Sequence, residues 1–279
     1  MSVRVIPRLE IKGPNVVKGI QMEGLRVLGS PKEFAENYYL SGADELLYVD
    51  VVASLYQRNS LLQTIEQTAM HIAIPLTVAG GIRSIADIRA ALLVGADKVA
   101  LNTAAIKRPE FISEAANRFG SSTIVVSIEA KRQSSGKYEA YTDAGRERTG
   151  IDALNWAQQA ASLGAGEILL TSIDREGTGN GFDLELTEAV TQSVSIPVIT
   201  CGGAGRPEHV RDVILNAHAD AVAISSILHY STINGGRNGR TGGATPGLTA
   251  SHIHPMPLAD LKKYLRNNGV ACRPAENDV

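Results

Sequence analysis

Cysteine is scarce in this chain, and long hydrophobic runs are missing. The 279 residues include only two cysteines, Cys201 and Cys272, which are too few for a disulfide framework and favour a reducing, cytoplasmic setting. No stretch approaches the roughly 18 apolar residues of a membrane span. The amino terminus leads directly into an apolar strand pattern and does not resemble a signal peptide. We therefore expect neither a disulfide-stabilised secreted domain nor a membrane protein.

A large excess of charge of one sign is also missing. Lys and Arg number 27 and Asp and Glu 29, so the net charge is −2, which argues against nucleic acid as the main partner. Hydrophobic residues make up 44% of the chain, enough for a large core. The length of 279 residues suits one (β/α)8 barrel, for which about 250 residues is typical.

What the chain does contain is an internal repeat at nearly half its length. Three segments recur 122 or 123 residues later in the same order, namely 42–47 at 164–169, 75–81 at 197–203 and 96–100 at 219–223. A fourth match, offset by 119 residues, relates two strand ends that stop at Glu10 and Glu129. Eight strand signals alternating with helical ones predict a single (β/α)8 TIM barrel over 1–279, made of half-barrels 1–120 and 121–279.

Two long segments lie after the first predicted strand of each half. Residues 13–31 contain four glycines and no helical period, which predicts a mobile lid over the barrel mouth. Lys18 lies in this segment, and a solvated lysine is the simpler alternative for it. The polar loop 131–150 contains a stretch at 138–142 that suggests a short hairpin arm.

A third segment, residues 231–255, interrupts the second half. It is rich in Gly, Asn, Arg, Thr and Ser and has no periodicity, which predicts a flexible insert. A helical pattern from 257 to 269 then closes the barrel. His252 and His254 in this segment are too few ligands for a metal site, and we predict neither a metal nor a cofactor.

Paired glycines end two of the predicted strands and recur with the repeat. Backbone N–H groups at such strand ends, together with a following helix, bind phosphate on many barrels. A duplicated signal predicts a substrate that is phosphorylated at both ends and stretched across the barrel mouth, although glycine pairs can also merely pack a helix against a strand. The predicted phosphate residues are Gly81, Asn102, Thr103, Gly202, Gly203, Ser225 and Ser226, and the first pair begins at Gly80.

Glu10 and Glu129 are the candidate catalytic residues. Both follow an apolar strand, and the half-barrel relation places them on opposite sides of the mouth. Two opposed carboxylates suit acid–base chemistry on a substrate held between them. The alternative is a structural role, with each glutamate ion-paired to Lys12 or Lys131. Asp50 and Asp174 end other strands and are supporting candidates.

Four charged residues fall near the opposite ends of the strands. They carry two charges of each sign and begin the first, second, fourth and sixth predicted strands: Arg4, Glu45, Lys98 and Glu167. On the residues alone, the simpler interpretation is an ion-pair cluster that stabilises the bottom of the barrel.

Five ordered stretches carry a resemblance to a known family: 16–19, 44–46, 95–99, 102–105 and 164–175. Through them the chain resembles the HisF family, the cyclase subunits of imidazole glycerol phosphate synthase. The resemblance covers Arg4 to about Ser226 and resumes at Leu258. It is much more specific than a lone glycine motif.

The resemblance implies a lyase that acts in histidine biosynthesis. Such a cyclase cleaves a bisphosphorylated ribulosyl aminoimidazole carboxamide and cyclises it to imidazole glycerol phosphate. The resemblance also implies a glutaminase partner on the N-terminal face of the barrel, which delivers ammonia through it. The four charged residues above then match the gate of the ammonia passage, and Lys18 the lysine of a mobile loop. Further candidates for substrate or phosphate binding are Asp50, Thr171, Glu176 and Gly177.

The chain departs from the family pattern at three carboxylates. The family has aspartate where this chain has Glu10, Glu129 and Glu176, and each change keeps the charge but adds a methylene. The site is therefore either compensated or adapted to another substrate. One alternative is a paralogue that supplies ammonia for sugar amidation in surface polysaccharide biosynthesis. Another is a sugar isomerase with the same two-phosphate half-barrel design, which has no need of the four-charge cluster.

Overall fold

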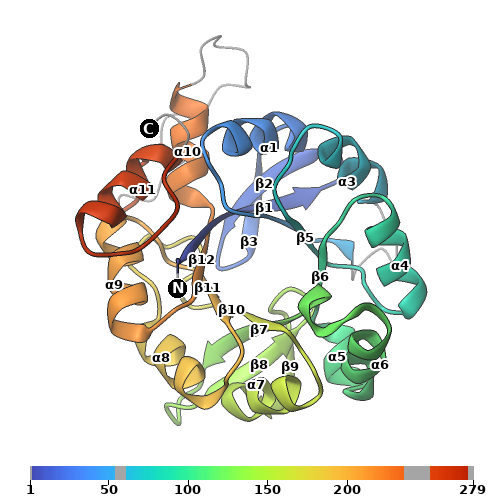
Figure 1. Ribbon diagram of the computed structural model, residues 1–279. Helices are drawn as coiled ribbons and strands as arrows, with labels where there is room; N and C mark the ends of the chain where they lie inside the picture. Colours follow the sequence, from blue (N-terminus) through green and yellow to red (C-terminus); the bar gives the residue numbers. More distant parts are fainter. Residues whose placement is uncertain (1, 54–60, 236–251, 276–279) are drawn as a thin grey trace.

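Eight parallel strands close into a barrel, as predicted (Figure 1). The computed structural model describes residues 2–53, 61–235 and 252–275. Strand order around the barrel is β1-β4-β5-β6-β7-β10-β11-β12, and β12 pairs with β1. The strands are β1 (Arg4–Lys12), β4 (Leu46–Asp50), β5 (Leu76–Ala79), β6 (Lys98–Leu101), β7 (Ile124–Arg132), β10 (Glu167–Ser172), β11 (Val198–Cys201) and β12 (Ala221–Ile224).

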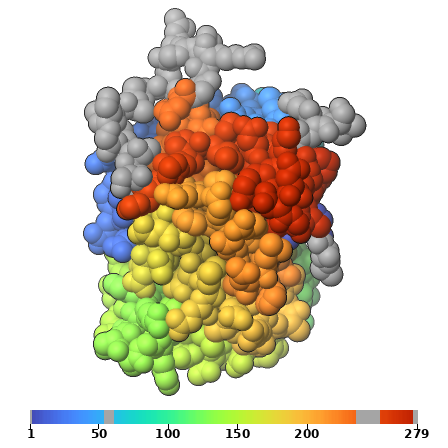
Figure 2. Space-filling view, turned by 90° about the vertical axis from the view of Figure 1, so that its left-hand side faces the viewer, coloured from blue at the N-terminus to red at the C-terminus, as the bar shows by residue number. Residues whose placement is uncertain are grey.

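Helices surround the strands and bury their apolar faces against the outer side of the barrel (Figure 1). They are α1 (Pro31–Leu40), α3 (Leu62–Ala69), α4 (Ile85–Leu93), α5 (Thr103–Lys107), α6 (Glu110–Phe119), α7 (Ala153–Ser162), α8 (Leu184–Ser193), α9 (Pro207–Ala217), α10 (Ser226–Gly235) and α11 (Leu258–Asn267), with a 3-10 turn at Ser121–Thr123. Figure 2 shows α8, α9 and α11 side by side on one flank. Ser84 caps α4, because its side chain accepts the N–H of Asp87.

Three aspartates fix the starts of neighbouring strands. Each carboxylate accepts the backbone N–H of the first residues of another strand, at 2.8 Å for Asp44 with Val5, 2.8 Å for Asp97 with Leu76, and 2.9 Å for Asp220 with Val198. The second and third contacts are related by the sequence repeat. The repeat is therefore visible in side-chain contacts as well as in strand order.

The segment expected to be a lid contains an antiparallel hairpin of β2 (Asn15–Ile20) and β3 (Glu23–Gly29), which extends β1. It is held down because Val16 and Val17 are buried in the barrel wall. The predicted arm at 138–142 is confirmed as β8 (Tyr138–Thr142), which pairs with β7 and with β9 (Glu147–Asp152). Each hairpin thus extends the first barrel strand of one half.

The expectation of a flexible insert over 231–255 is wrong at both of its ends. Helix α10 continues to Gly235, and Ile253 is buried, while the N–H of His254 donates to the carbonyl of Gly205 at 2.8 Å. The remainder, 236–251, lies outside the described residues. None of the helices in the described part of the chain is long and apolar enough to cross a membrane.

Candidate active site

The inward face of β1 sets out the layers of the barrel interior. Because strand side chains alternate between faces, Val5, Leu9 and Ile11 pack under the helices. The other face presents Arg4, Ile6, Arg8 and Glu10 in turn. Arg4 lies at the bottom of the barrel, Ile6 in an apolar band above it, and Arg8 and Glu10 line a cavity at the mouth.

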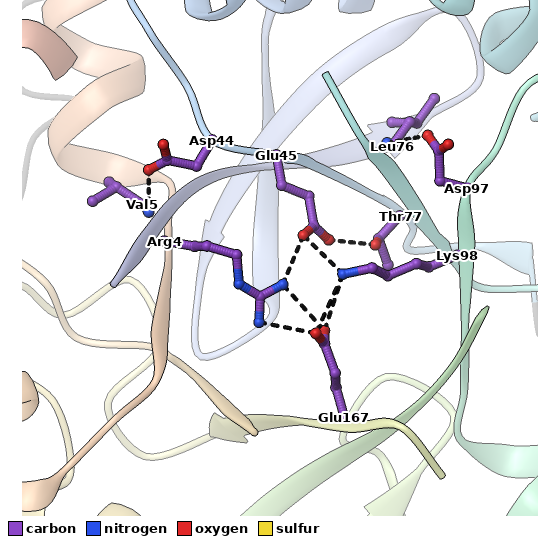
Figure 3. A network of polar contacts seen from close by, with 9 residues as sticks. All are labelled: Arg4, Val5, Asp44, Glu45, Leu76, Thr77, Asp97, Lys98 and Glu167. Atoms are coloured by element: carbon purple, nitrogen blue, oxygen red, sulfur yellow. Dashed lines mark hydrogen bonds and ion pairs between the residues drawn. The ribbon is translucent and has the colours of Figure 1, made fainter. Parts of the chain in front are cut away.

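At the bottom, four side chains form a closed charged ring, which we define as Arg4, Glu45, Lys98 and Glu167 (Figure 3). Arg4 contacts Glu45 at 2.9 Å and Glu167 at 3.0 Å, and Lys98 contacts the same two carboxylates at 3.0 and 3.3 Å. Glu45 is the most buried member and also accepts the hydroxyl of Thr77 at 2.5 Å. The four residues predicted from scattered positions therefore meet at one point.

An apolar band lies directly above the charged ring. Two positions after each ring residue the chain has a buried apolar side chain: Ile6, Leu47, Ala100 and Leu169. The band also includes Ala79, Val125, Ile199, Ala221 and Ala223. An ion crossing this band would lose its hydration without gaining a partner, whereas a small neutral molecule would not incur that cost.

Above the apolar band lies a second charged layer, the inner cluster of Arg8, Glu10, Lys18 and Glu176. Lys18 contacts both oxygens of Glu10 at 3.1 Å and also contacts Glu176. All four side chains are buried, so Lys18 is not a solvated lysine. Glu10 is ion-paired with Lys18 and Arg8 and not with the exposed Lys12.

The charges of the inner cluster stabilise one another. Burial alone would lower the pKa of Lys18, but the carboxylates of Glu10 and Glu176 outweigh it and hold that pKa above its usual value. Burial alone would raise the pKa of Glu176, but Lys18 and Arg8 hold it well below its usual range. Both groups are therefore charged at neutral pH, as an ion pair.

Glu129 is in a different environment on the opposite side of the cavity. Its carboxylate is half-buried and accepts the N–H of Gly145 at 2.8 Å, and it does not pair with the exposed Lys131. Withdrawal from bulk water raises its pKa to about 7, even though Arg8 acts in the opposite direction. A carboxyl group with such a pKa can both give and take a proton near neutral pH.

Each of the two glycine pairs lines a hollow at the mouth of the barrel. The first pair, with Asp50, Asn102 and Thr103, lines the main cavity of about 240 Å³ beside Glu10, Lys18 and Glu129. The second hollow is a small depression lined by Glu176, Gly177, Cys201, Gly202, Gly203, Ser225 and Ser226. The inner cluster lies between them, because Glu176 lines the depression and its partners line the cavity.

Glycine is required at equivalent points of the two pairs. Gly80 has φ +92°, and a Cβ there would lie 2.4 Å from the carbonyl oxygen of Asp50. Gly202 has φ +99°, and its Cβ would lie 2.8 Å from the carbonyl oxygen of Ser172. In both halves, the strand end therefore approaches the neighbouring backbone too closely for a side chain.

Two predicted residues lie outside the cavity and the depression. Thr171 is buried in β10, in register with Glu129. Asp174 accepts the backbone N–H of Arg132 at 2.8 Å, which indicates a structural role. Asp50, in contrast, lines the cavity, and it also accepts the N–H of Val52 at 3.0 Å.

In the described part of the chain, no three His, Cys, Asp or Glu side chains are grouped to hold a metal ion.

Sequence reasoning missed Arg8 and Cys201. Arg8 is buried on the inward face of β1, and its Nη1 donates to the Cys201 sulfur at 2.8 Å. The available signal was the alternation of β1, which places residue 8 on the same face as residues 4 and 10.

Comparison with known proteins agrees with this geometry. A family model described as "Histidine biosynthesis protein" matches residues 4–234. The chain is 58% identical over 207 residues to the imidazole glycerol phosphate synthase subunit HisF of Legionella pneumophila, a match that covers 74% of this chain and 98% of that protein. The chain therefore belongs to the histidine biosynthesis protein family and is a homologue of HisF.

Proposed function

We propose that this protein is the cyclase subunit of an imidazole glycerol phosphate synthase, a cytoplasmic lyase of histidine biosynthesis. It takes ammonia from a glutaminase docked at the charged-ring end of the barrel. It uses that ammonia to cleave a bisphosphorylated ribulosyl aminoimidazole carboxamide and cyclise it to imidazole glycerol phosphate. The relationship to HisF supports this reaction.

The proposal rests mainly on one observation, which is that charged groups lie at both ends of the same barrel interior. The charged ring closes the bottom, and the cavity with two opposed glutamates opens at the mouth. The apolar band between them suits passage of neutral ammonia and opposes passage of ammonium. A barrel that only isomerised a sugar would have no need for a charged entrance at its closed end.

The glutamates divide the proton transfers between them. Glu10, which contacts Lys18 at 3.1 Å, serves as proton acceptor. Glu129, with a pKa of about 7, is protonated in a large fraction of molecules at neutral pH and serves as proton donor. Such a division requires two carboxyl groups in unlike environments.

The two phosphates of the substrate hold it across the mouth. One phosphate binds the backbone around Gly81 and Thr103 in the cavity, and the other binds at the depression near Gly203 and Ser226, where α10 begins. A substrate fixed at both ends lies over the inner cluster. This places its reacting centre between Glu10 and Glu129.

The test is steady-state turnover of the bisphosphate with ammonium as the nitrogen source. We expect measurable turnover by the native protein and a loss of roughly 10²-fold or more in kcat for Glu10→Gln or Glu129→Gln. Bisphosphate affinity should be retained, because the phosphate sites are unchanged. A folded native protein that binds the bisphosphate but does not turn it over would refute the proposal and favour the paralogue of sugar amidation.

A further inference from the structure

Arg8 is the least expected side chain in the barrel. It is 4% exposed and lies on the inward face of β1, four residues after the charged-ring member Arg4. A guanidinium group held away from water is costly unless its donors are satisfied. Its Nε is buried and has no hydrogen-bond partner among the described residues.

The guanidinium of Arg8 joins carboxylates from two halves of the barrel. Its Nη2 lies 3.4 Å from Glu10 Oε1, and its Nη1 lies 3.4 Å from Glu176 Oε2. Lys18 contacts the same two carboxylates. Two cations therefore alternate with two anions, and Arg8 is the member that faces the apolar band, where Cys201 contacts it.

We propose that Arg8 is a positioning residue of the reaction site, which fixes Glu10 and Glu176 across the barrel axis at the point where the apolar band meets the cavity. This inference rests on the proposed function for its link to catalysis. Planar guanidinium holds two carboxylates in defined directions, which an ammonium group cannot do. Arg8 thereby orients one carboxylate beside each predicted phosphate site.

The charge of Arg8 also acts on Glu129 across the cavity. The groups that act most strongly on Glu129 are Arg8 from β1, Asp143 and the Gly145 N–H from the turn between β8 and β9, and Asn102 after β6. Among these leading groups Arg8 is the cation, and its charge lowers the pKa of Glu129. The same cavity is also lined by other cations, namely Lys18, Arg83, Lys107 and Arg146. Removing the charge of Arg8 should therefore raise the pKa of Glu129.

Two measurements on the full-length protein test the inference. The first is turnover with ammonium for the native protein, Arg8→Met and Arg8→Lys. The second, which needs no substrate, follows the Glu129 carboxyl signal by carbon-13 NMR during a pH titration, with Glu129→Gln identifying the signal. Arg4→Met is the matched control, because it removes the same charge from the same strand at the other end of the barrel.

We expect kcat of Arg8→Met to fall about 10²-fold, because the carboxylates lose their orientation. In Arg8→Met, the midpoint of the Glu129 carboxyl titration should rise by on the order of one pH unit. Arg8→Lys should recover part of kcat and leave the midpoint near its native value, and Arg4→Met should not move the midpoint.

A folded Arg8→Met with native kcat, or with an unmoved midpoint, would overturn the inference. If Arg8→Met does not fold, Arg8→Lys decides, and native kcat in that variant would overturn it. A native protein without turnover would refute the proposed function instead, and the titration would still decide whether Arg8 controls Glu129.

Discussion

The raised pKa of Glu129 predicts that this residue destabilises the barrel as the pH increases. The pKa is near 4.5 in an ordinary glutamate and about 7 in the folded protein. Between these values the folded state binds a proton that the unfolded state has lost, so the free energy of unfolding falls as the pH rises. The loss begins near pH 4.5 and is complete above about pH 7.

The size of the effect follows from the shift. A shift from 4.5 to about 7 corresponds to about 3.5 kcal/mol at most, at about 1.4 kcal/mol per pH unit. Because the carboxyl group is half-buried and lines the cavity, solvent screens part of this, and we expect about 1–3 kcal/mol.

The assay is urea unfolding at pH 5 and pH 8.5 for the native protein and Glu129→Gln. A glutamine cannot ionise, so the variant should lose less stability over this range than the native protein does. Glu147→Gln is the control, because Glu147 is an exposed glutamate on β9. Equal pH dependence in all three proteins would refute the reasoning.

Three other predictions concern the same face of the barrel. Glu10→Asp and Glu129→Asp should each lower kcat with ammonium by up to about 10²-fold, because the site fits the longer side chains. Bisphosphate binding should not weaken. An increased kcat would contradict this prediction. Soaking crystals in phosphate should fill the cavity of about 240 Å³ before the depression of about 10 Å³, and finding neither occupied would refute both sites. Gly80→Ala should lower the free energy of unfolding, measured in urea, by about 1–3 kcal/mol. The loss should be larger than for Gly136→Ala, because Gly136 also has a positive φ but has open space for a Cβ. Equal losses in the two variants would contradict the clash with Asp50.

The sequence predicted features that repeat or alternate. The barrel could be predicted because the same strand ends recur 122 or 123 residues apart. The charged residues of the ring could be found because each lies at or just before the start of a strand, and parallel strands of a barrel start on one face. Their contacts, such as Arg4 with Glu167, follow from the closure of the sheet.

Features set by distant contacts could not be predicted in the same way. The glycines of residues 13–31 gave no sign of strands, but Val16 and Val17 are buried and the segment forms a hairpin. Lys18 is buried because it meets Glu176, which is 158 residues away in the chain. No local pattern contains that information.

We propose that ammonia enters at the charged ring and reacts at the mouth of the same barrel. The most direct test compares glutamine-driven turnover, measured with the glutaminase partner, and turnover driven by free ammonium. Lys98→Ala removes a ring contact to Glu45 of 3.0 Å far from the cavity, and Lys137→Ala is an exposed control. We expect Lys98→Ala to lower the glutamine-driven rate relative to the ammonium-driven rate, and Lys137→Ala to leave the ratio unchanged. Equal losses with both nitrogen sources, or loss of folding alone, would contradict the claim and leave the ring a purely structural cluster.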